Sequence, residues 1–232
     1  MRLDKLLANK AYGSRKEVHQ IIKDRRVTIN GEITTKKDTH IDIDIDIVAV
    51  DGQTVNTTQL YYVKFHKPKG YVTAVEDSTH PVVMDLLPPE YLKMGVVPVG
   101  RLDKDTEGLL LLTNDGVWGH SIINGHKHVP KVYYVEFEGE LSEEGIQRIK
   151  EGIVLGDETQ CKPALIELLS DQSATITIEE GKYHQVKRMI GAAGGFVTYL
   201  KRLTIGHIDL SGIEEVGSVM DLTIDEIEGF KK

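Results

Sequence analysis

The spacing of apolar residues predicts two short helices at the start of the chain. Leucines recur at helical intervals in residues 2–11, with charged side chains between them. In residues 14–22, Ser14 and Glu17 have the S-x-x-E spacing of a capping box, and apolar side chains follow at intervals of three and four. This second segment is therefore predicted to be a helix capped by Ser14.

Alternating apolar and polar residues predict strands in the next part of the chain. Residues 25–33 alternate and contain an Asn-Gly pair, which is a strong signal for a hairpin turn. Residues 41–50, IDIDIDIVAV, predict another strand. Their aspartates could suggest a calcium loop, but Ile47 stands where such a loop needs glycine, so a water-facing strand is the preferred interpretation. Residues 1–56 thus predict a helix-helix-strand-strand unit, followed by a polar linker at 56–59.

The rest of the chain mixes strands with fewer helices. Four consecutive leucines end at an Asn-Asp-Gly turn and indicate a buried strand. Strands are predicted over residues 61–74 with a break at Pro68, and over 94–100, 109–113, 131–139 and 174–178, with short strands at the C-terminal end. Helices are predicted over residues 117–123, 141–153 and 186–193. The pattern predicts an α+β fold: a small N-terminal helix-helix-strand module, 1–58, and a larger domain, 61–232, with a mixed, largely antiparallel sheet and flanking helices.

The charge of the chain is unevenly distributed. The whole sequence has a formal net charge of -8, which taken alone argues against a nucleic-acid partner. Residues 1–40, however, hold ten Lys and Arg against five Asp and Glu, while the remaining residues carry a net charge of -13. This asymmetry suggests a basic binding module joined to an acidic body.

Cysteine content and hydropathy favour a cytoplasmic protein. Cys161 is the sole cysteine, so no disulfide can form within the chain and no thiolate metal cluster is expected. The first ten residues carry several charges, and no run of eighteen apolar residues occurs. We therefore expect a cytoplasmic protein without a membrane anchor or a membrane partner.

The sequence patterns of common cofactor sites are missing. The chain has no phosphate-binding loop of the G-x-x-x-x-G-K type, no G-x-G-x-x-G after a strand, no H-E-x-x-H and no G-x-S-x-G. His120, His126 and His128 lie close in sequence without an accompanying carboxylate pattern, so exposed loop histidines are preferred over a metal site. Neither a metal nor an organic cofactor is expected.

Each candidate residue, taken singly, has a plain structural explanation. Asp103 of the GRLD sequence stands directly ahead of the leucine run and would fit a loop or a cap. Tyr133 would fit a core aromatic residue, Lys187 a solvated position on a helix, and KPKG at 67–70 a turn. The combination of these sequences is more informative than any one of them.

That combination resembles a known enzyme family. GRLDKDTEGLLLLTNDG at 100–116, preceded by KPKG and followed by KVYYV at 131–135 and EGKYHQVKRM at 180–189, is similar to the pseudouridine synthases that modify small-subunit ribosomal RNA and to their large-subunit relatives. The N-terminal sequence RLDKLLANKAYGSRKEVHQIIKDRRVTINGEI resembles the S4 RNA-binding module that commonly precedes this catalytic body. The resemblance covers about residues 61–228, and the two modules stand in the expected order.

The resemblance implies roles for three residues in the conversion of uridine to pseudouridine. Asp103 would be the nucleophile that attacks the base or the sugar of a flipped-out nucleotide. Tyr133 would stack on the uracil and assist a late proton removal. Lys187 occupies a position where many relatives have arginine, and it is expected to pair with Asp103 and keep that carboxylate ionised.

Further residues are expected to contact RNA. The resemblance assigns Arg101 to the space that the extruded nucleotide leaves, whereas the structural alternative is a salt bridge from Arg101 to Asp105 or Glu107. Residues expected to contact RNA are Arg2, Lys5, Ser14, Arg15, Lys16, Lys23, Arg25, Arg26, Lys67 and Arg101. For the N-terminal cations the alternative is a solvated helical face.

These expectations describe a 16S rRNA pseudouridine synthase with ribosomal RNA, in a partly assembled small subunit, as its partner. The chain is expected to be a monomer. The alternatives are a 23S rRNA enzyme with the same chemistry and a non-catalytic RNA-binding factor for ribosome assembly. A glycoside hydrolase that uses Asp103 with Asp105 or Glu107 is a more distant alternative, because adjacent loop carboxylates seldom face each other across a bond.

Overall fold

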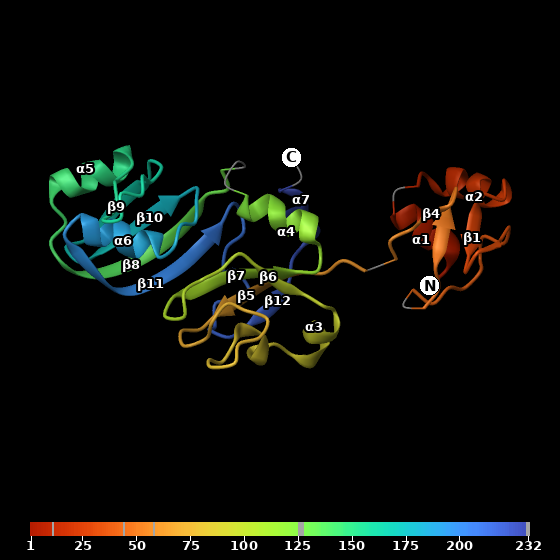
Figure 1. Cartoon of the computed structure of the whole chain (residues 1–232), viewed down its shortest axis with the longest axis horizontal. Coiled ribbons are helices and arrows are strands. Elements are labelled where there is room, and N and C mark those ends of the chain that lie inside the picture. The colour runs from red at the N-terminus through yellow and green to blue at the C-terminus, as the bar shows by residue number, and fades with distance from the viewer. Residues whose placement is uncertain (11, 44, 58, 125–127, 231–232) are drawn as a thin grey trace. The chain divides into compact units, whose positions relative to one another are not determined.

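The structure is a computed structural model that describes residues 1–10, 12–43, 45–57, 59–124 and 128–230. The chain forms two compact units, Met1–Gln59 and Leu60–Lys232 (Figure 1). Each unit has a hydrophobic core of its own. Within the described ranges, no helix combines the length and the apolar character needed to cross a bilayer.

The N-terminal unit packs two helices against short strands. Its elements are α1 (Leu3–Asn9), α2 (Arg15–Lys23), β1 (Val27–Ile29), β2 (Glu32–Ile33), β3 (Val48–Val50) and β4 (Gln53–Thr54). The predicted capping box at α2 is confirmed: the Ser14 side chain accepts a hydrogen bond from the Glu17 amide, and the Glu17 carboxylate accepts one from the Ser14 amide. Leucines of α1 and apolar residues of α2 are buried together in the core.

The strands of this unit follow the order β2-β1-β3-β4 with antiparallel pairing. The predicted hairpin joins β1 to β2, and Asn30 and Gly31 both have positive φ, at 53° and 87°. A two-residue turn of this kind matches the twist of paired strands, and glycine adopts the required backbone conformation without strain. The predicted linker at 56–59 includes residue 58, which lies outside the described residues.

The strand predicted over residues 41–50 is wrong for most of its length. Only β3 pairs as a strand, and the described part of 41–47 forms a loop with turn residues at 43 and 45 instead. The Asp46 carboxylate accepts hydrogen bonds from the Asp42 amide and the Asn30 side chain. Ile41 is buried and Ile43 packs against the core, but Ile45 and Ile47 are exposed, so the alternation gives no continuous buried face. Aspartate side chains here bind nearby backbone groups, which competes with strand pairing.

The larger unit is built around one extended sheet. Its strands are β5 (Tyr62–Lys67), β6 (Val97–Val99), β7 (Glu107–Thr113), β8 (Lys131–Gly139), β9 (Leu165–Ser170), β10 (Ser173–Ile178), β11 (Gly195–Ile205) and β12 (Val219–Asp221). Its helices are the 3-10 helix η1 (Val83–Leu86), α3 (Pro89–Lys93), α4 (Gly116–Ile123), α5 (Glu143–Glu151), α6 (Gln185–Ala192) and α7 (Ile224–Glu228). The described strands follow the order β12-β5-β7-β11-β8-β10-β9, with β6 paired to β7.

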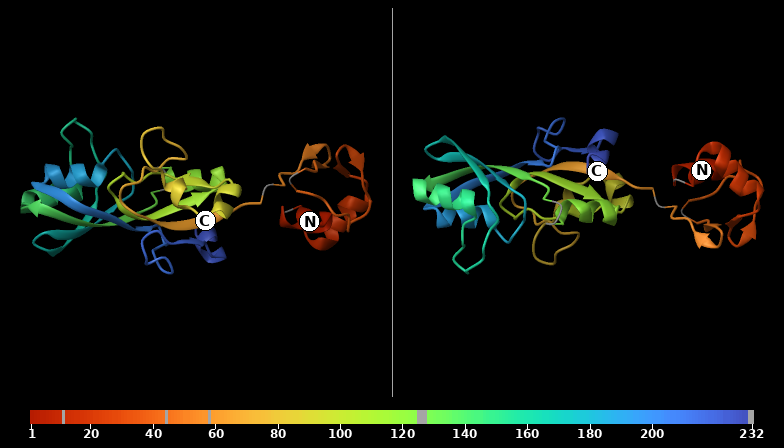
Figure 2. Two further views of the ribbon diagram at one scale, coloured as in Figure 1. Left: turned by 90° about the horizontal axis from the view of Figure 1, so that it is seen from below. Right: turned by 90° about the horizontal axis from the view of Figure 1, so that it is seen from above.

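The leucine run forms β7 and is buried on both faces of the sheet, as predicted. Leu110 and Leu112 pack in one core with α5 and α6, while Leu109 and Leu111 pack in another with α4. Figure 2 shows β8 and β11 extending from the α4 side of this unit towards α5. The predicted α+β fold with a mixed, largely antiparallel sheet is confirmed.

The C-terminal part of the sheet differs from the prediction of short strands. β11 has eleven residues and lies in the middle of the sheet between β7 and β8. It runs parallel to β7 where Arg202 faces Gly108. Gly108 has a φ of 115°, and a Cβ atom added to it would lie 2.2 Å from the Arg202 carbonyl oxygen. Only glycine therefore permits this approach of the two strands.

Candidate active site

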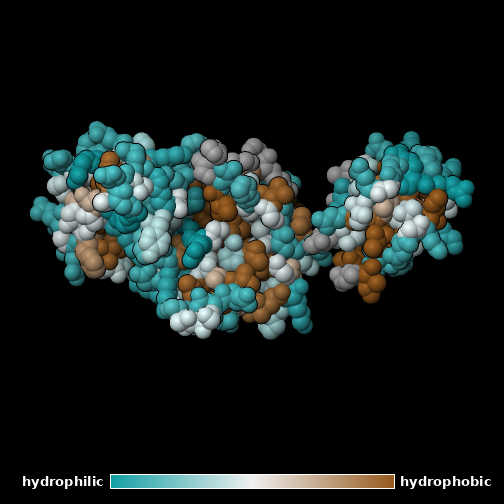
Figure 3. All heavy atoms as spheres, in the orientation of Figure 1, coloured by the Kyte–Doolittle hydropathy of each residue, from teal (hydrophilic) through white to brown (hydrophobic). Residues whose placement is uncertain are grey.

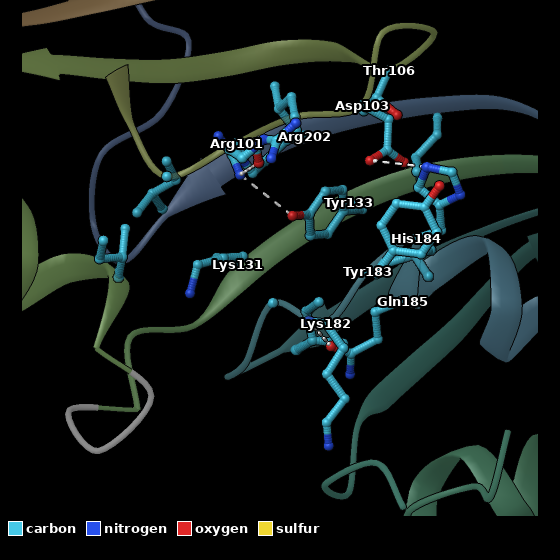
Figure 4. Close-up of a pocket in the computed structure, with 18 of the residues that line it drawn as sticks. Arg101, Asp103, Thr106, Lys131, Tyr133, Lys182, Tyr183, His184, Gln185 and Arg202 are labelled. Carbon is cyan, nitrogen blue, oxygen red and sulfur yellow. Dashed lines mark hydrogen bonds and ion pairs between the residues drawn. The ribbon is translucent and has the colours of Figure 1, made fainter. Parts of the chain in front are cut away.

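The GRLD loop lies at the wall of a cavity of about 620 Å³ in the larger unit. The loop before β7, the end of α4, strands β8 and β11, and the turn leading into α6 all contribute lining residues (Figure 4). Figure 3 shows hydrophobic residues gathered in the area of α4 and β6 on an otherwise largely hydrophilic face. The lining combines this apolar surface with a few charged side chains, as is usual for ligand sites.

Hydrogen bonds from a neighbouring turn fix the backbone of the GRLD loop. The Thr73 hydroxyl donates to the Leu102 carbonyl oxygen at 2.7 Å and accepts from the Leu102 amide at 3.1 Å. The Gly70 amide donates to the Lys104 carbonyl oxygen at 2.7 Å. The segment that carries Asp103 is therefore held from the side of the KPKG turn.

Lys67 makes most of the contacts that hold this loop. Its position contradicts the expectation that it contacts RNA. Its side chain is fully buried, and its ammonium donates to the carbonyl oxygens of Pro68, Asp103, Lys104 and Thr106 at 2.8–3.4 Å. Burial lowers the pKa of Lys67 to about 8, so the group is still largely protonated at neutral pH. Lys67 therefore holds the loop around Asp103 and is inaccessible to a polynucleotide.

The predicted pair between Asp103 and Lys187 is present. Lys187 Nζ lies 3.1 Å from Asp103 Oδ2 and 2.5 Å from Asp105 Oδ1, so one ammonium serves both carboxylates. Burial alone would lower the pKa of Lys187, but its hydrogen bonds to Asp105 and Asp103 outweigh burial and raise it. His184 Nε2 lies 3.6 Å from the other oxygen of Asp103. Asp103 is thus partly exposed between two nitrogen groups.

Tyr133 projects into the same cavity from β8, beside a buried arginine. The Tyr133 side chain is 8% exposed, and Arg202 Nη1 lies 3.5 Å from its hydroxyl oxygen. Arg202 Nε donates to the Leu109 carbonyl oxygen at 2.7 Å. Among the described residues no carboxylate pairs with Arg202, and its Nη2 atom has no hydrogen-bond partner. A cation held this way supplies positive potential to the cavity.

Lys131 is a second cation at the cavity. Neither Lys131 nor Arg202 was predicted from the sequence as a site residue. Burial and the nearby Arg202 guanidinium lower the pKa of Lys131 to about 8, and its ammonium donates to the Val129 carbonyl oxygen. Lys131 belongs to the KVYYV sequence, two residues before Tyr133, so strand periodicity could have placed both on one face. The alternation of β11 gives a weaker signal, since Arg202 follows Leu200 on the inward face.

Arg101 is exposed at the cavity and forms no ion pair with Asp105 or Glu107. Asp105 pairs instead with Lys187, and Glu107 contacts Tyr199 and Lys201 on another side. The structural alternative for Arg101 is therefore wrong. Its guanidinium remains available at the rim of the cavity.

The predicted RNA-contacting residues of the N-terminal unit are all exposed. They are Arg2, Lys5, Ser14, Arg15, Lys16, Lys23, Arg25 and Arg26. Three of them are engaged within the unit: Ser14 caps α2, Arg2 pairs with Asp4, and Arg26 pairs with Asp51. Exposed pairs of this kind are weak and can exchange for a phosphate partner.

The histidine group considered from the sequence is described only in part. His126 lies outside the described residues, whereas His120 is exposed on α4 and His128 Nδ1 lies 2.9 Å from the Glu179 carboxylate. Within the described ranges no group of three or more potential ligands is arranged to hold a metal ion.

Comparison with known proteins identifies the family of this chain. Residues 61–192 match the family described as RNA pseudouridylate synthase, and residues 1–44 match the S4 domain. The chain belongs to the RNA pseudouridylate synthase family. Its members are isomerases that convert uridine to pseudouridine. The predicted family and enzyme class are confirmed.

Relatives of this family match along the whole chain. The uncharacterized RNA pseudouridine synthase YtzG of Bacillus subtilis is 43% identical over 98% of this chain and 97% of its own length. Ribosomal small subunit pseudouridine synthase A of Escherichia coli K12 is 37% identical over 98% of each chain, and that of Pasteurella multocida 36% over 100% of each. A crystal structure of a pseudouridylate synthase, 35% identical, covers 99% of both chains with a TM-score of 0.69.

Proposed function

We propose that the protein is an rRNA pseudouridine synthase that isomerises a specific uridine of 16S rRNA, with Asp103 as the nucleophile. The observation that carries this proposal is the full-length match to enzymes named ribosomal small subunit pseudouridine synthase A. In the proposed arrangement, residues 1–58 bind RNA and residues 61–232 perform the isomerisation. The protein acts as a cytoplasmic monomer on RNA of a partly assembled small subunit.

The proposed chemistry needs an ionised carboxylate facing an extruded nucleotide. The reaction breaks the bond between ribose C1′ and uracil N1 and rejoins the base through C5. A carboxylate can form a covalent adduct with either the base or the sugar and can leave again, and both routes need it free of a proton. The contact between Lys187 and Asp103 at 3.1 Å supports this arrangement, because the ammonium is a counter-ion that orients the carboxylate at the wall of the cavity.

The other groups of the cavity support the handling of the uracil. Tyr133 offers a ring on which the base can stack. Arg202 and Lys131 supply positive charge in a partly buried cavity. This charge stabilises the negative charge that develops on the uracil oxygens when the bonds to the ring break and form. The exposed Arg101 can occupy the space that the uridine leaves in the RNA.

The test is the position of pseudouridine in ribosomal RNA from a strain without the gene. We expect one pseudouridine of 16S rRNA to disappear and to return when the wild-type gene is restored. Restoration with Asp103→Asn should not return it, although the variant folds and binds RNA. Loss of a 23S rRNA pseudouridine instead would assign the large-subunit alternative. Full restoration by Asp103→Asn would indicate a role other than catalysis by this carboxylate.

A further inference from the structure

Beside Asp103, an aromatic residue of the larger unit is exposed in a way that packing within the chain does not explain. The Tyr183 side chain is 76% exposed at the mouth of the cavity. An exposed ring at the mouth of a cavity offers an apolar face on which a planar group of a ligand can stack. Phe196, at 71%, is also highly exposed but does not line the cavity.

Tyr183 is held in place by the residue that follows it. Its ring stacks on the imidazole of His184, with centroids 3.8 Å apart and an angle of 19° between the planes (Figure 4). His184 has a φ of 47°, a left-handed conformation that costs a non-glycine residue about 1 kcal/mol or more and is often found at binding sites. One face of the Tyr183 ring is therefore covered by His184, while most of its side chain is in contact with solvent.

The stack is directly connected to the proposed nucleophile. His184 Nε2 lies 3.6 Å from Asp103 Oδ1, so Asp103, His184 and Tyr183 follow one another across the mouth of the cavity. A planar group on the open face of Tyr183 would be separated from Asp103 by the two stacked rings, so it would belong to another nucleotide than the one bound at Asp103. In an RNA chain this position corresponds to a neighbouring nucleotide.

We propose that Tyr183, supported by His184, is a stacking platform for the nucleobase next to the extruded uridine. This inference rests on the proposed function and identifies a further substrate-binding element of the same site. The neighbouring base loses a stacking partner when the uridine leaves the helix, and an aromatic side chain that is already fixed replaces it at little entropic cost. Exposed Arg101 and Lys104 at the same rim can hold the adjacent phosphates.

The test compares RNA affinity and single-turnover rate for variants of the full-length protein. The probe is a small-subunit rRNA fragment that contains the uridine mapped in the deletion strain. Tyr183→Ala should raise the Kd about 10-fold to 100-fold, which lies within the range expected for the loss of one stacked base. Tyr183→Phe should restore the affinity to within about threefold, since stacking does not need the hydroxyl. Phe196→Ala is the matched control and should not change the Kd.

Abasic substitutions in the RNA connect the platform to one base. Removal of the base on the 5′ or on the 3′ side of the uridine should raise the wild-type Kd as much as Tyr183→Ala does. That abasic RNA should bind Tyr183→Ala and wild type equally well, because the abasic substitution and Tyr183→Ala each remove the same stacking interaction. The saturated single-turnover rate should change far less than the Kd.

The inference is overturned if neither abasic RNA loses affinity, or if Tyr183→Ala lowers the saturated rate at an unchanged Kd. The second result would assign Tyr183 an action on Asp103 through His184. Failure of the proposed function is distinguishable from both, because wild-type protein would then form no pseudouridine in the small-subunit fragment.

Discussion

Positively charged side chains serve different purposes in the two units of this protein. In the N-terminal unit all but the half-buried Lys10 are exposed, and Arg2 and Arg26 pair with the acids Asp4 and Asp51. In the larger unit, Lys67 and Arg202 are buried and bind backbone carbonyl oxygens. Exposed cations can exchange a water or carboxylate partner for a phosphate at little cost in free energy. Buried cations cannot leave their hydrogen-bond partners without destabilising the fold.

This difference shows why a count of charges misjudges the larger unit. Its net charge is strongly negative, yet its cavity is lined by the buried Arg202 and the partly buried Lys131, neither of which forms an ion pair with a carboxylate in the described part of the chain. The acids that outnumber them lie mostly elsewhere on the surface. Local potential at a site therefore depends on burial and on hydrogen bonding more than on the total charge.

The largest effect is expected from Lys67→Met. The substitution leaves four carbonyl oxygens without their donor, which should lower the free energy of unfolding by about 3 kcal/mol. The loop of Asp103 would also shift, and a misplacement of about 1 Å can reduce the rate about 100-fold. Urea unfolding and single-turnover pseudouridine formation measure the two effects.

Lys69→Met is the matched control for this change, because Lys69 is exposed in the same turn and only covers the Tyr199 ring. It should cost about 1 kcal/mol or less. Equal losses from the two substitutions would contradict the distinction between buried and exposed cations in this turn.

Lys187, which is partly exposed, should show the next largest effect on activity. Lys187→Ala removes the cation that pairs with Asp103 and orients it, and it should reduce the single-turnover rate about 100-fold while the fold is retained. Lys187→Arg keeps the charge and should recover most of the rate. Asp105→Asn removes the competing carboxylate, so it should affect the rate less than Lys187→Ala does.

Lys131→Met should separate stability from activity. The pKa of Lys131 is lowered to about 8 from an ordinary value of 10.5, mainly by burial. Between pH 8 and pH 10.5 the lysine is more protonated in the unfolded chain than in the folded one. The free energy of unfolding of the wild type therefore rises with pH across this window, and the gain is lost as pH falls to about 8.

At pH 7, Lys131→Met should therefore increase the free energy of unfolding by about 1 kcal/mol or less, after allowance for solvent screening. It should lower the isomerisation rate, because the cavity loses a cation. Unfolding curves at pH 7 and pH 10 measure the effect. A variant that is less stable than wild type at pH 7 would show that the ammonium is a net stabilising group.

The smallest effect on the fold is expected in the N-terminal unit. Arg15→Glu together with Lys16→Glu should change the free energy of unfolding by about 0.5 kcal/mol or less, since both side chains are exposed. RNA affinity should fall, and its dependence on salt concentration should become shallower, because fewer phosphates are neutralised. An unchanged slope in binding titrations from low to high salt would remove both residues from the RNA interface.

The features that the sequence predicted correctly depend on local patterns. The capping box of Ser14 involves residues three positions apart, and the leucine run of β7 is buried because four consecutive apolar residues need apolar neighbours on both faces. The pair between Asp103 and Lys187 joins distant residues, and it was predicted through the resemblance to a family rather than through periodicity.

The features that were missed depend on contacts between distant segments. The KPKG sequence indicates a turn, but nothing in it shows that Lys67 reaches carbonyl oxygens almost forty residues later. Arg202 is buried because β11 runs between β7 and β8, which the local sequence does not reveal. In residues 41–47, aspartate side chains that bind the backbone replaced the strand that alternation predicted.

The glycine at position 108 has a consequence for how this gene tolerates mutation. The residue contacts no substrate in the proposed function and is not part of the cavity lining, yet any side chain there would collide with the main chain of Arg202. In a saturation library scored by growth or ribosome content, codon 108 should be nearly as intolerant as codon 103. Such a screen would detect the contact between these two strands as readily as it detects the proposed nucleophile.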